Sequence, residues 1–404
     1  MNAPIIIVGA AQAGLQVAEQ LRADGYDGAL TLIGDEPHPP YQRPPLSKAF
    51  LTGEMTEDRL VLRGKDLLAG KGIDLVTGTR VAAIDRAARH LTLADGARLA
   101  WSGLALATGA RPRALAIPGA GLPGVVLLRT IEDSRRVAQG IAAARRVAVV
   151  GGGFIGLEIA AAARKAGRDV VLLEALDRLL ARTSTPVISK FFFELHKEHG
   201  VDIRLGAQVT GFSGDTHVSG VTTADGATHA ADLVVVGIGI VPNAELAAGC
   251  GLACERGIVV DACSRTSDPA IVAAGDCTAR RTDEGTLLRL ESVQNAIEQA
   301  KSAAAALLGK ERPFVAAPWF WSDQYDVRLQ MAGLSAGHDR TVLRGAIADR
   351  RFSVFYFRGD RLVAVDSVNR APDHIAARRL LDAGRSPTFA QAADEACALA
   401  ALAK

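Results

Sequence analysis

Three glycines and one glutamate in the middle of the chain have the types and the spacing needed to bind a dinucleotide. Gly151, Gly153 and Gly156 form a G-x-G-x-x-G pattern, and Glu174 ends the next apolar run. The first glycine permits a tight turn, the second lets a pyrophosphate approach the backbone, and the third lets helix and strand pack closely. A carboxylate after the second strand accepts hydrogen bonds from a ribose diol and would repel a 2′-phosphate. The pattern therefore predicts a site that prefers NADH to NADPH.

The surrounding sequence predicts the elements that must position these residues. Residues 147–150 are a short β-branched apolar run, typical of a buried parallel strand. Residues 157–165 favour a helix, and the apolar run 169–173 leads to Glu174. The helix N-terminus offers N–H groups and a partial positive charge to phosphates. A lone G-x-G-x-x-G is weak evidence, so this context decides for a dinucleotide site over a purely structural turn.

The N-terminal part carries a second copy of the same pattern. Gly9 and Gly14 occupy the first and third glycine positions, and Ala11 replaces the middle glycine. The methyl group of Ala11 leaves little room between backbone and pyrophosphate. Asp35 or Glu36 would contact the ribose, and we favour Asp35 because it follows the strand more directly. The strand, helix and strand of this copy are predicted over 5–8, 15–22 and 30–33. Two such folds usually indicate two dinucleotides, most commonly a tightly held FAD and a diffusible nicotinamide.

Three further segments have residues suited to a flavin. The proline-rich stretch 39–48 is rigid and holds the cations Arg43 and Lys48 near the first phosphate turn, although it could also be only a stiff loop. Asp276 follows a short strand and a glycine, where its carboxylate can bond ribityl hydroxyls. A helix that opens at 291–296 and runs to 308 would direct its N-terminal dipole at the electron-rich pyrimidine end of a flavin.

The C-terminal part has a different composition and predicts a small α+β domain. Trp319 and Trp321 lie at its start, where they serve either as hinge packing or as an aromatic wall beside a flavin; the sequence leaves both open. Its antiparallel strands are predicted over 328–332, 341–344, 352–357 and 362–368, with a helix over 376–381.

These patterns together predict an α/β fold. Two Rossmann-like dinucleotide-binding domains, one for FAD and one for NADH, precede a C-terminal α+β domain with an antiparallel sheet, in a glutathione-reductase-like architecture. The expected division is 1–112 and 241–317 for the FAD-binding domain, 113–240 for the NADH-binding domain and 318–404 for the C-terminal domain.

Composition excludes several classes of function. The 404 residues are 49% apolar and 22% charged with a net charge of +2, which gives no reason to expect a nucleic-acid partner. We expect no signal peptide, because the N-terminal apolar run is too short, is wrongly flanked and leads directly into a predicted strand. We expect no membrane span, because no apolar run approaches about 18 residues. The five cysteines include no C-x-x-C pair, so isolated reduced thiols of a cytoplasmic protein are expected, without a bound metal or iron–sulfur cluster. The eight histidines lack ligand spacing, and none is predicted to be a catalytic base.

The order of the motifs resembles the FAD-dependent NADH:ferredoxin reductases of oxygenase systems over essentially the whole chain. The matching segments are PYQRPPLSK, LALATGARPR, LLRTIED, GGGFIGLE, TSDPAIVAAGDC, ESVQNA and PWFWSDQ. The resemblance implies FAD contacts at Ala13, Asp35, Arg43, Lys48, Val81, Arg129, Asp276 and Val293. It implies NADH contacts at the Gly151–Gly156 turn, Glu158, Glu174 and Arg182, and an aromatic residue near the flavin at Trp319.

The resemblance also implies a mechanism and a partner. Lys48 and Glu158 would pair at the point of hydride transfer, where exclusion of water strengthens an ion pair. NADH would give a hydride to FAD, which would pass single electrons to a two-iron two-sulfur ferredoxin, usually an acidic protein. That ferredoxin would serve a haem monooxygenase or a ring-hydroxylating dioxygenase.

Three alternatives share parts of this pattern. A disulfide reductase of the glutathione-reductase type needs a cysteine pair beside the flavin, where this chain has PPYQRPPLSK. An NADH oxidase or peroxidase needs a redox cysteine near the first fold, which is also absent. A signalling flavoprotein of the apoptosis-inducing-factor kind would usually carry targeting or basic nucleic-acid-binding segments, and this chain has neither.

Overall fold

The computed structural model describes residues 4–282 and 285–403, and these form two compact units. The first unit consists of Met1–Gln42, Glu57–Arg111 and Val241–Pro318, and the second of Arg43–Thr56, Pro112–Ile240 and Trp319–Lys404. The proline-rich segment from Arg43 onward therefore groups with the central and C-terminal parts of the chain. The short strands β8 (Ala110–Pro112) and β17 (Ile240–Pro242) lie where the chain passes between the units.

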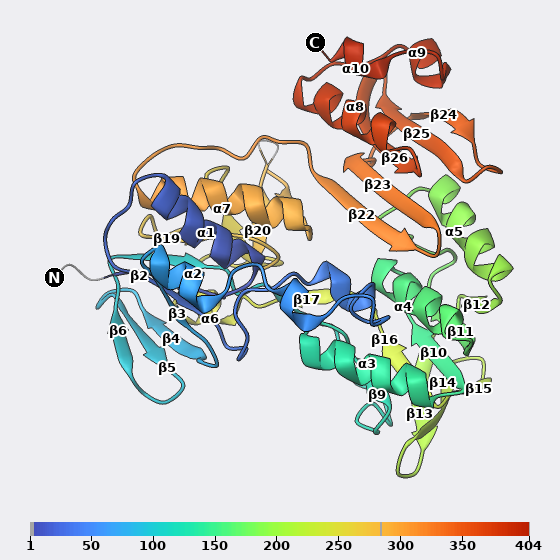
Figure 1. Ribbon diagram of the computed structural model, residues 1–404, viewed down its shortest axis with the longest axis horizontal. Helices are drawn as coiled ribbons and strands as arrows, with labels where there is room; N and C mark the ends of the chain where they lie inside the picture. The colour runs from blue at the N-terminus through green and yellow to red at the C-terminus, as the bar shows by residue number, and fades with distance from the viewer. Residues whose placement is uncertain (1–3, 283–284, 404) are drawn as a thin grey trace. The chain divides into compact units, whose positions relative to one another are not determined.

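The first unit is built on a five-stranded parallel sheet in the order β19-β7-β1-β2-β3. Apolar side chains on both faces keep the strands buried, as expected of a parallel sheet covered on both sides. Helices α1 and α7 pack side by side against one face (Figure 1). The glycine turn that follows β1 and the acidic residue Asp35 that follows β2 thus lie at the carboxyl end of this sheet. Doubly wound folds bind their ligands at that end.

The elements of the first unit have the following bounds. Its main sheet contains β1 (Ile5–Val8), β2 (Leu30–Ile33), β3 (Ile73–Val76), β7 (Gly103–Leu106) and β19 (Ile271–Ala273). Two small sheets contain β4 (Val81–Asp85), β5 (His90–Leu93) and β6 (Arg98–Ala100), and β18 (Ile258–Val260), β20 (Thr278–Arg281) and β21 (Leu287–Leu288). The helices are α1 (Gln12–Ala23), α2 (Lys65–Gly70), α6 (Glu245–Gly249), α7 (Val293–Leu307) and the 3₁₀ turn η2 (Glu57–Leu60).

The second unit contains a further parallel sheet in the order β12-β11-β10-β16-β9 and a C-terminal antiparallel sheet in the order β22-β23-β26-β25-β24. The parallel sheet contains β9 (Val125–Val126), β10 (Arg146–Val150), β11 (Asp169–Glu174), β12 (Val201–Leu205) and β16 (Leu233–Val236), and β13 (Val209–Gly214), β14 (Val218–Thr223) and β15 (Thr228–Ala230) form a separate sheet. The helices of this part are α3 (Ile131–Ala143), α4 (Phe154–Lys165), α5 (Pro186–Glu198) and the 3₁₀ turn η1 (Pro44–Ser47).

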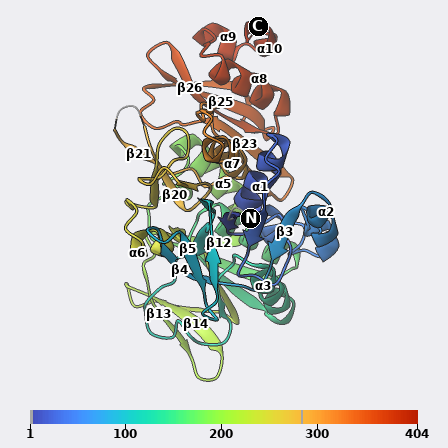
Figure 2. The same cartoon turned by 90° about the vertical axis from the view of Figure 1, so that its left-hand side faces the viewer.

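Helices cover one face of the C-terminal sheet, as both ribbon views show (Figures 1 and 2). The strands are β22 (Trp319–Gln324), β23 (Val327–Gly333), β24 (Arg340–Ala346), β25 (Arg351–Arg358) and β26 (Arg361–Val368), and the helices are α8 (Ala371–Asp382), α9 (Phe389–Ala393) and α10 (Leu399–Leu402). Helix α8 begins five residues before the predicted start at 376, because Pro372 stands in its first turn, where a proline is tolerated.

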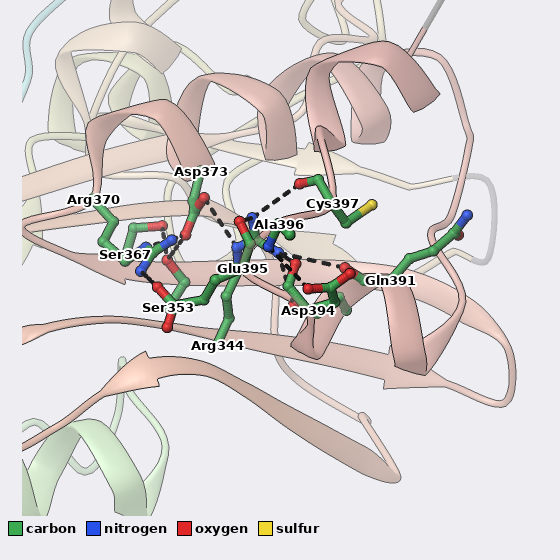
Figure 3. A network of polar contacts seen from close by, with 11 residues as sticks. Arg344, Ser353, Ser367, Arg370, Asp373, Gln391, Asp394, Glu395, Ala396 and Cys397 are labelled. Atoms are coloured by element: carbon green, nitrogen blue, oxygen red, sulfur yellow. Dashed lines mark hydrogen bonds and ion pairs between the residues drawn. The ribbon is translucent and has the colours of Figure 1, made fainter.

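A buried arginine fixes the end of the chain onto this sheet (Figure 3). Arg344 on β24 is 4% exposed and lies 3.3 Å from the Asp373 carboxylate of α8. Its guanidinium also donates to the backbone carbonyls of Asp394, Glu395 and Cys397, which follow α9. One buried cation therefore binds three carbonyl groups of the segment that follows α9.

Candidate functional site

In the turn between β10 and α4 of the second unit, each of the three glycines is needed for a different physical reason. Gly151 has a φ of +107°, and a Cβ there would lie 2.5 Å from the Gly237 carbonyl oxygen. A Cβ at Gly156 would lie 2.0 Å from the Gly151 carbonyl oxygen, so helix α4 can approach the turn only without a side chain. Gly153 has an unstrained φ of −80°, and no atom lies within 4 Å of where its Cβ would be. Gly153 therefore leaves open space in front of the helix.

The N-terminus of α4 has hydrogen-bond donors available for phosphate oxygens. No side chain caps it, whereas Thr130 and Ser292 cap α3 and α7. Glu174 stands at the end of β11, where its carboxylate accepts hydrogen bonds from the backbone N–H groups of Gly152 (2.6 Å) and Leu176 (2.9 Å). These contacts orient Glu174 and leave further lone pairs for a ribose diol. The turn, the uncapped helix and the oriented acid fit a dinucleotide without a 2′-phosphate.

The first unit repeats this construction with one change. Gly9 has a φ of +114°, and a Cβ at Gly14 would lie 1.8 Å from the Gly9 carbonyl oxygen. Ala11 occupies the N-cap of α1, the position of Gly153 in α4, with extended backbone that any residue adopts. No side chain caps α1. The alanine therefore costs no backbone strain, and its methyl group narrows only the space in front of the helix.

The acidic residue of the first unit, Asp35, lies one position later relative to its strand than Glu174 does in the second unit. The register of β1 with β2 pairs Val8 with Ile33, as Val150 pairs with Leu173, so Gly34 is the counterpart of Glu174. A Cβ at Gly34 would lie 2.7 Å from the Ala10 Cβ, which explains the glycine. Asp35 follows and is exposed, while the Glu36 carboxylate accepts a hydrogen bond from Tyr41 at 2.5 Å. These positions fit the choice of Asp35 for a ribose.

The other residues expected to hold FAD in the first unit lie on separate elements. Ala13 is buried in the first turn of α1, and Val81 is buried at the start of β4. Asp276 is half-buried after Gly275, whose φ of +86° makes the turn out of β19. Val293 is the first residue of α7.

Arg43, Arg129 and Arg182 belong to the second unit. The Arg43 guanidinium donates to the Arg129 carbonyl at 2.7 Å, so these two expected FAD contacts lie together. Arg182 is exposed and donates to the Ile238 carbonyl at 3.2 Å, beside the end of β16.

The most distinctive polar contact in the second unit is a buried ion pair. The Lys48 ammonium lies 2.8 Å from Glu158 Oε2, with the side chains 18% and 3% exposed. Ser47 donates to the same carboxylate oxygen at 2.5 Å. Lys48 is placed by η1, which two prolines begin, and Glu158 by the second turn of α4. The pair predicted from the resemblance is therefore formed, and it lies one turn beyond the uncapped N-terminus of α4.

Trp319 lies among aromatic and basic side chains at the start of β22. Its ring centroid lies 5.6 Å from that of Trp321, and the Arg378 guanidinium lies over the ring at 4.6 Å. The edge of the His374 ring also contacts it. Trp319 is only half-buried, so part of the ring remains open to a ligand or partner.

Three residues of this site were not predicted individually from the sequence. Ser322 donates to Glu158 Oε1 at 2.6 Å, Gln324 donates to Ser322 at 3.1 Å, and His196 contacts Gln324 at 2.8 Å. The only sequence signal is the alternation of Ser322 and Gln324 within the segment PWFWSDQ, which places them on one face of a strand. No local pattern connects them to a histidine 128 residues away.

Comparison with known proteins now decides the family. Residues 3–300 match the pyridine nucleotide-disulphide oxidoreductase family, and residues 319–403 match the reductase C-terminal family. The chain belongs to the pyridine nucleotide-disulphide oxidoreductases. It is 48% identical to rhodocoxin reductase of Rhodococcus erythropolis over 96% of this chain and 92% of the relative, and 47% identical to putidaredoxin reductase of Pseudomonas putida over 91% and 89%.

Solved structures of this oxidoreductase family support the same relationship. The ferredoxin reductase for the CYP199A2 system of Rhodopseudomonas palustris superposes with a TM-score of 0.97 at 44% identity, covering all of both chains. The covalent putidaredoxin reductase–putidaredoxin complex gives 0.95 at 44% identity, over 98% of this chain and 97% of that one. The predicted fold class and the predicted resemblance are both confirmed, and FAD and NADH are the cofactors that this family implies.

The family is described as disulphide oxidoreductases, but the thiols of this chain are poorly suited to disulfide exchange. All five cysteines are free, and the first of them is Cys250, far along the chain from the first phosphate turn. Burial raises the pKa of the Cys250, Cys254 and Cys277 thiols, which lowers the thiolate fraction needed for disulfide exchange. Within residues 4–282 and 285–403, no helix is long and apolar enough to span a bilayer, and no cluster of acidic, cysteine or histidine side chains could hold a metal ion.

Proposed function

We propose that this protein is an FAD-dependent NADH:ferredoxin oxidoreductase that feeds a haem monooxygenase or a ring-hydroxylating dioxygenase. The observation that carries the proposal is the buried Lys48–Glu158 pair, formed where a disulfide reductase would need a cysteine pair. The relatives support it: rhodocoxin reductase and putidaredoxin reductase match nearly end to end, and a reductase component of anthranilate 1,2-dioxygenase is 42% identical.

FAD, when bound, supplies the step from a two-electron hydride donor to one-electron acceptors. Every other part of the reaction depends on binding and positioning by the chain. Gly151, Gly153 and Gly156 form the turn that receives the NADH pyrophosphate, and Glu174 selects NADH by contacting the ribose diol. Arg182 is a further NADH contact in this proposal.

The flavin-side roles are assigned residue by residue. Gly9, Gly14 and Ala13 receive the FAD pyrophosphate, Asp35 the ribose, and Asp276 the ribityl chain. The remaining FAD contacts are proposed at Arg43, Lys48, Val81, Arg129 and Val293. We assign residues 1–112 and 241–317 to the FAD-binding domain, 113–240 to the NADH-binding domain and 318–404 to the C-terminal domain.

Lys48 and Glu158 act at the point of hydride transfer, with Trp319 as the nearby aromatic residue. A fixed ammonium–carboxylate pair in a water-poor site orients the reacting rings and complements the charge that moves with the hydride. No side chain needs to act as a classical acid or base, because a hydride carries both electrons and the proton together.

The protein partner is a two-iron two-sulfur ferredoxin, and the proposed location is the cytoplasm. Ferredoxins of this sort are usually acidic, so basic side chains at the docking surface would steer association. The rate constant for the reduced enzyme with ferredoxin should therefore fall as ionic strength rises from about 0.01 to 0.15 M, over which the Debye length shortens from about 30 to 8 Å. A rate that does not change with salt would refute electrostatic steering.

The function is tested by NADH oxidation with two acceptors compared under anaerobic conditions and with oxygen in a separate assay. The proposal predicts rapid reduction of a two-iron ferredoxin and slow turnover with glutathione disulfide; a parallel aerobic assay should show slow turnover with oxygen. Vigorous disulfide reduction without ferredoxin turnover would favour the disulfide-reductase alternative, and rapid oxygen consumption alone would favour an NADH oxidase.

A further inference from the structure

Strand β22 of the C-terminal sheet packs against helix α4. Phe320, Ser322 and Gln324 alternate along the strand and so share one face. Phe154 and Glu158 are four residues apart on α4 and also share one face. The Phe154 and Phe320 rings lie 4.8 Å apart, which brings Ser322 next to Glu158. The C-terminal region therefore supplies a side chain to the ion pair on the nucleotide-binding helix.

The direction of each hydrogen bond in this region follows from the Glu158 carboxylate. An ionised carboxylate only accepts, so the single hydroxyl proton of Ser322 must point at Glu158 Oε1, 2.6 Å away. The Ser322 oxygen is then an acceptor, which requires the amide nitrogen of Gln324 to face it at 3.1 Å. The amide oxygen of Gln324 consequently faces His196 Nε2 at 2.8 Å, and Nε2 must carry a hydrogen. All donors point towards Glu158.

The far end of this chain is also held in place. Burial lowers the pKa of His196 to about 4, so the imidazole is neutral at neutral pH and Nδ1 is left as an acceptor. The Tyr325 hydroxyl lies 3.4 Å from Nδ1, and the Tyr325 ring stacks on His199 at 3.6 Å. Tyr325 has a φ of +55° at the β22–β23 turn, a strained backbone for a bulky residue. This stack holds the tyrosine in place.

We propose that Ser322, Gln324 and His196 are positioning residues that hold the Glu158 carboxylate beside Lys48 through a one-way chain of hydrogen bonds. Lys48 and Ser47 hold Oε2, and Ser322 holds Oε1, so both edges of the carboxylate are fixed. Without Ser322, a buried acceptor would lose its donor and the carboxylate could rotate. The inference rests on the proposed function, because it takes Glu158 as a residue of the hydride-transfer site.

The kinetic test measures flavin reduction by NADH in the holoenzyme with stopped-flow absorbance. Ser322→Ala should lower the limiting rate about tenfold, the effect of losing one hydrogen bond to a charged group, while the dissociation constant of NADH changes less than twofold. Ser322→Thr keeps the hydroxyl and should restore the rate to within about threefold. Ser353→Ala is the matched control. Ser353 on β25 is also a buried serine, and its hydroxyl donates to the Asp373 carboxylate of α8. The Ser353→Ala variant should keep the wild-type rate.

A double-mutant cycle separates positioning from general packing. Gln324→Leu should lower the rate severalfold, and Ser322→Ala/Gln324→Leu should be no slower than Ser322→Ala alone, because Gln324 acts through Ser322. If the double variant were slower by the product of the two single decreases in rate, the substitutions would be two independent packing defects. That result would overturn the proposal. A Ser322→Ala rate within about twofold of wild type would overturn it as well.

A second readout does not depend on activity. NMR of protein labelled with ¹⁵N-histidine, with His196→Asn for assignment, should show neutral His196 with its hydrogen on Nε2 between pH 6 and 8. A hydrogen on Nδ1, or a cationic ring, would contradict the chain polarity and overturn the inference. If the enzyme oxidises NADH but fails these tests, the inference alone is refuted. If the holoenzyme does not oxidise NADH, the proposed function is refuted, and the NMR result still decides whether the chain of hydrogen bonds has the proposed direction.

Discussion

Replacing Lys48 by methionine tests the buried ion pair most directly. The variant keeps the length of the side chain and leaves the Glu158 carboxylate, 3% exposed, without its cation at 2.8 Å. At an effective dielectric constant of about 20, two unit charges at this distance attract by about 6 kcal/mol. Ser47 and Ser322 still donate to the carboxylate, and Lys48 is itself partly solvated, so we expect a net loss of about 3 kcal/mol in the free energy of unfolding.

The double variant Lys48→Met/Glu158→Gln provides the internal control. It removes both charges, and the new amide accepts from one serine through its oxygen and donates to the other through its nitrogen. The double variant should therefore lose about 2 kcal/mol less in the free energy of unfolding than Lys48→Met alone. Urea unfolding with saturating FAD, followed by tryptophan fluorescence and circular dichroism, gives these free energies provided that the two probes coincide. Flavin reduction by NADH should be slow in both variants.

Additive costs for the two substitutions would show that Lys48 and Glu158 do not interact energetically, whatever their distance. A Lys48→Met variant within about 0.5 kcal/mol of wild type would refute the reasoning in the same way.

Three further predictions concern other parts of the chain. Glu174→Gln combined with Ala175→Arg should raise kcat/KM for NADPH relative to NADH by about tenfold or more, because repulsion of a 2′-phosphate is replaced by attraction; unchanged selectivity would remove Glu174 from that role. Burial raises the pKa of Asp366 from 3.8 to about 7, so its stabilising contribution is complete below pH 3.8 and is lost as the pH rises to 7. As the pH rises from 5.5 to 8, the free energy of unfolding of Asp366→Asn, measured with urea, should therefore increase by about 2 kcal/mol relative to that of wild type. A difference between the two proteins that is independent of pH would contradict this. Arg344→Met should cost about 3 kcal/mol and increase hydrogen exchange in α9 and the segment after it, whereas unchanged protection there would show that the buried arginine does not hold the end of the chain.

The nucleotide-binding elements could be predicted because their signals are local. A glycine turn between an apolar strand and a small-residue helix places Gly151, Gly156 and Glu174 within one supersecondary unit, and the repeat at Gly9 and Gly14 does the same. Boundaries were less accurate, since the apolar pattern began at 157 while α4 begins at Phe154, directly after its Gly153 N-cap.

The Ser322–Gln324–His196 chain could not be predicted because it depends on tertiary packing. Ser322 meets Glu158 only because β22 lies along α4, and His196 lies on α5, a helix that no motif predicted. The alternation of Ser322 and Gln324 indicates only a shared strand face, and their contacts to Glu158 and His196 span more than 100 residues of sequence. The family resemblance supplied Lys48 and Glu158 as a pair, but not the residues that fix the carboxylate.

The central claim is that electrons pass from NADH through this chain to a two-iron ferredoxin. Anaerobic titration of ferredoxin with NADH, in the presence of catalytic amounts of the holoenzyme, tests it most directly. The account predicts two molecules of ferredoxin reduced per NADH, with slow turnover in Lys48→Met. Complete oxidation of NADH without reduction of the ferredoxin cluster would contradict it.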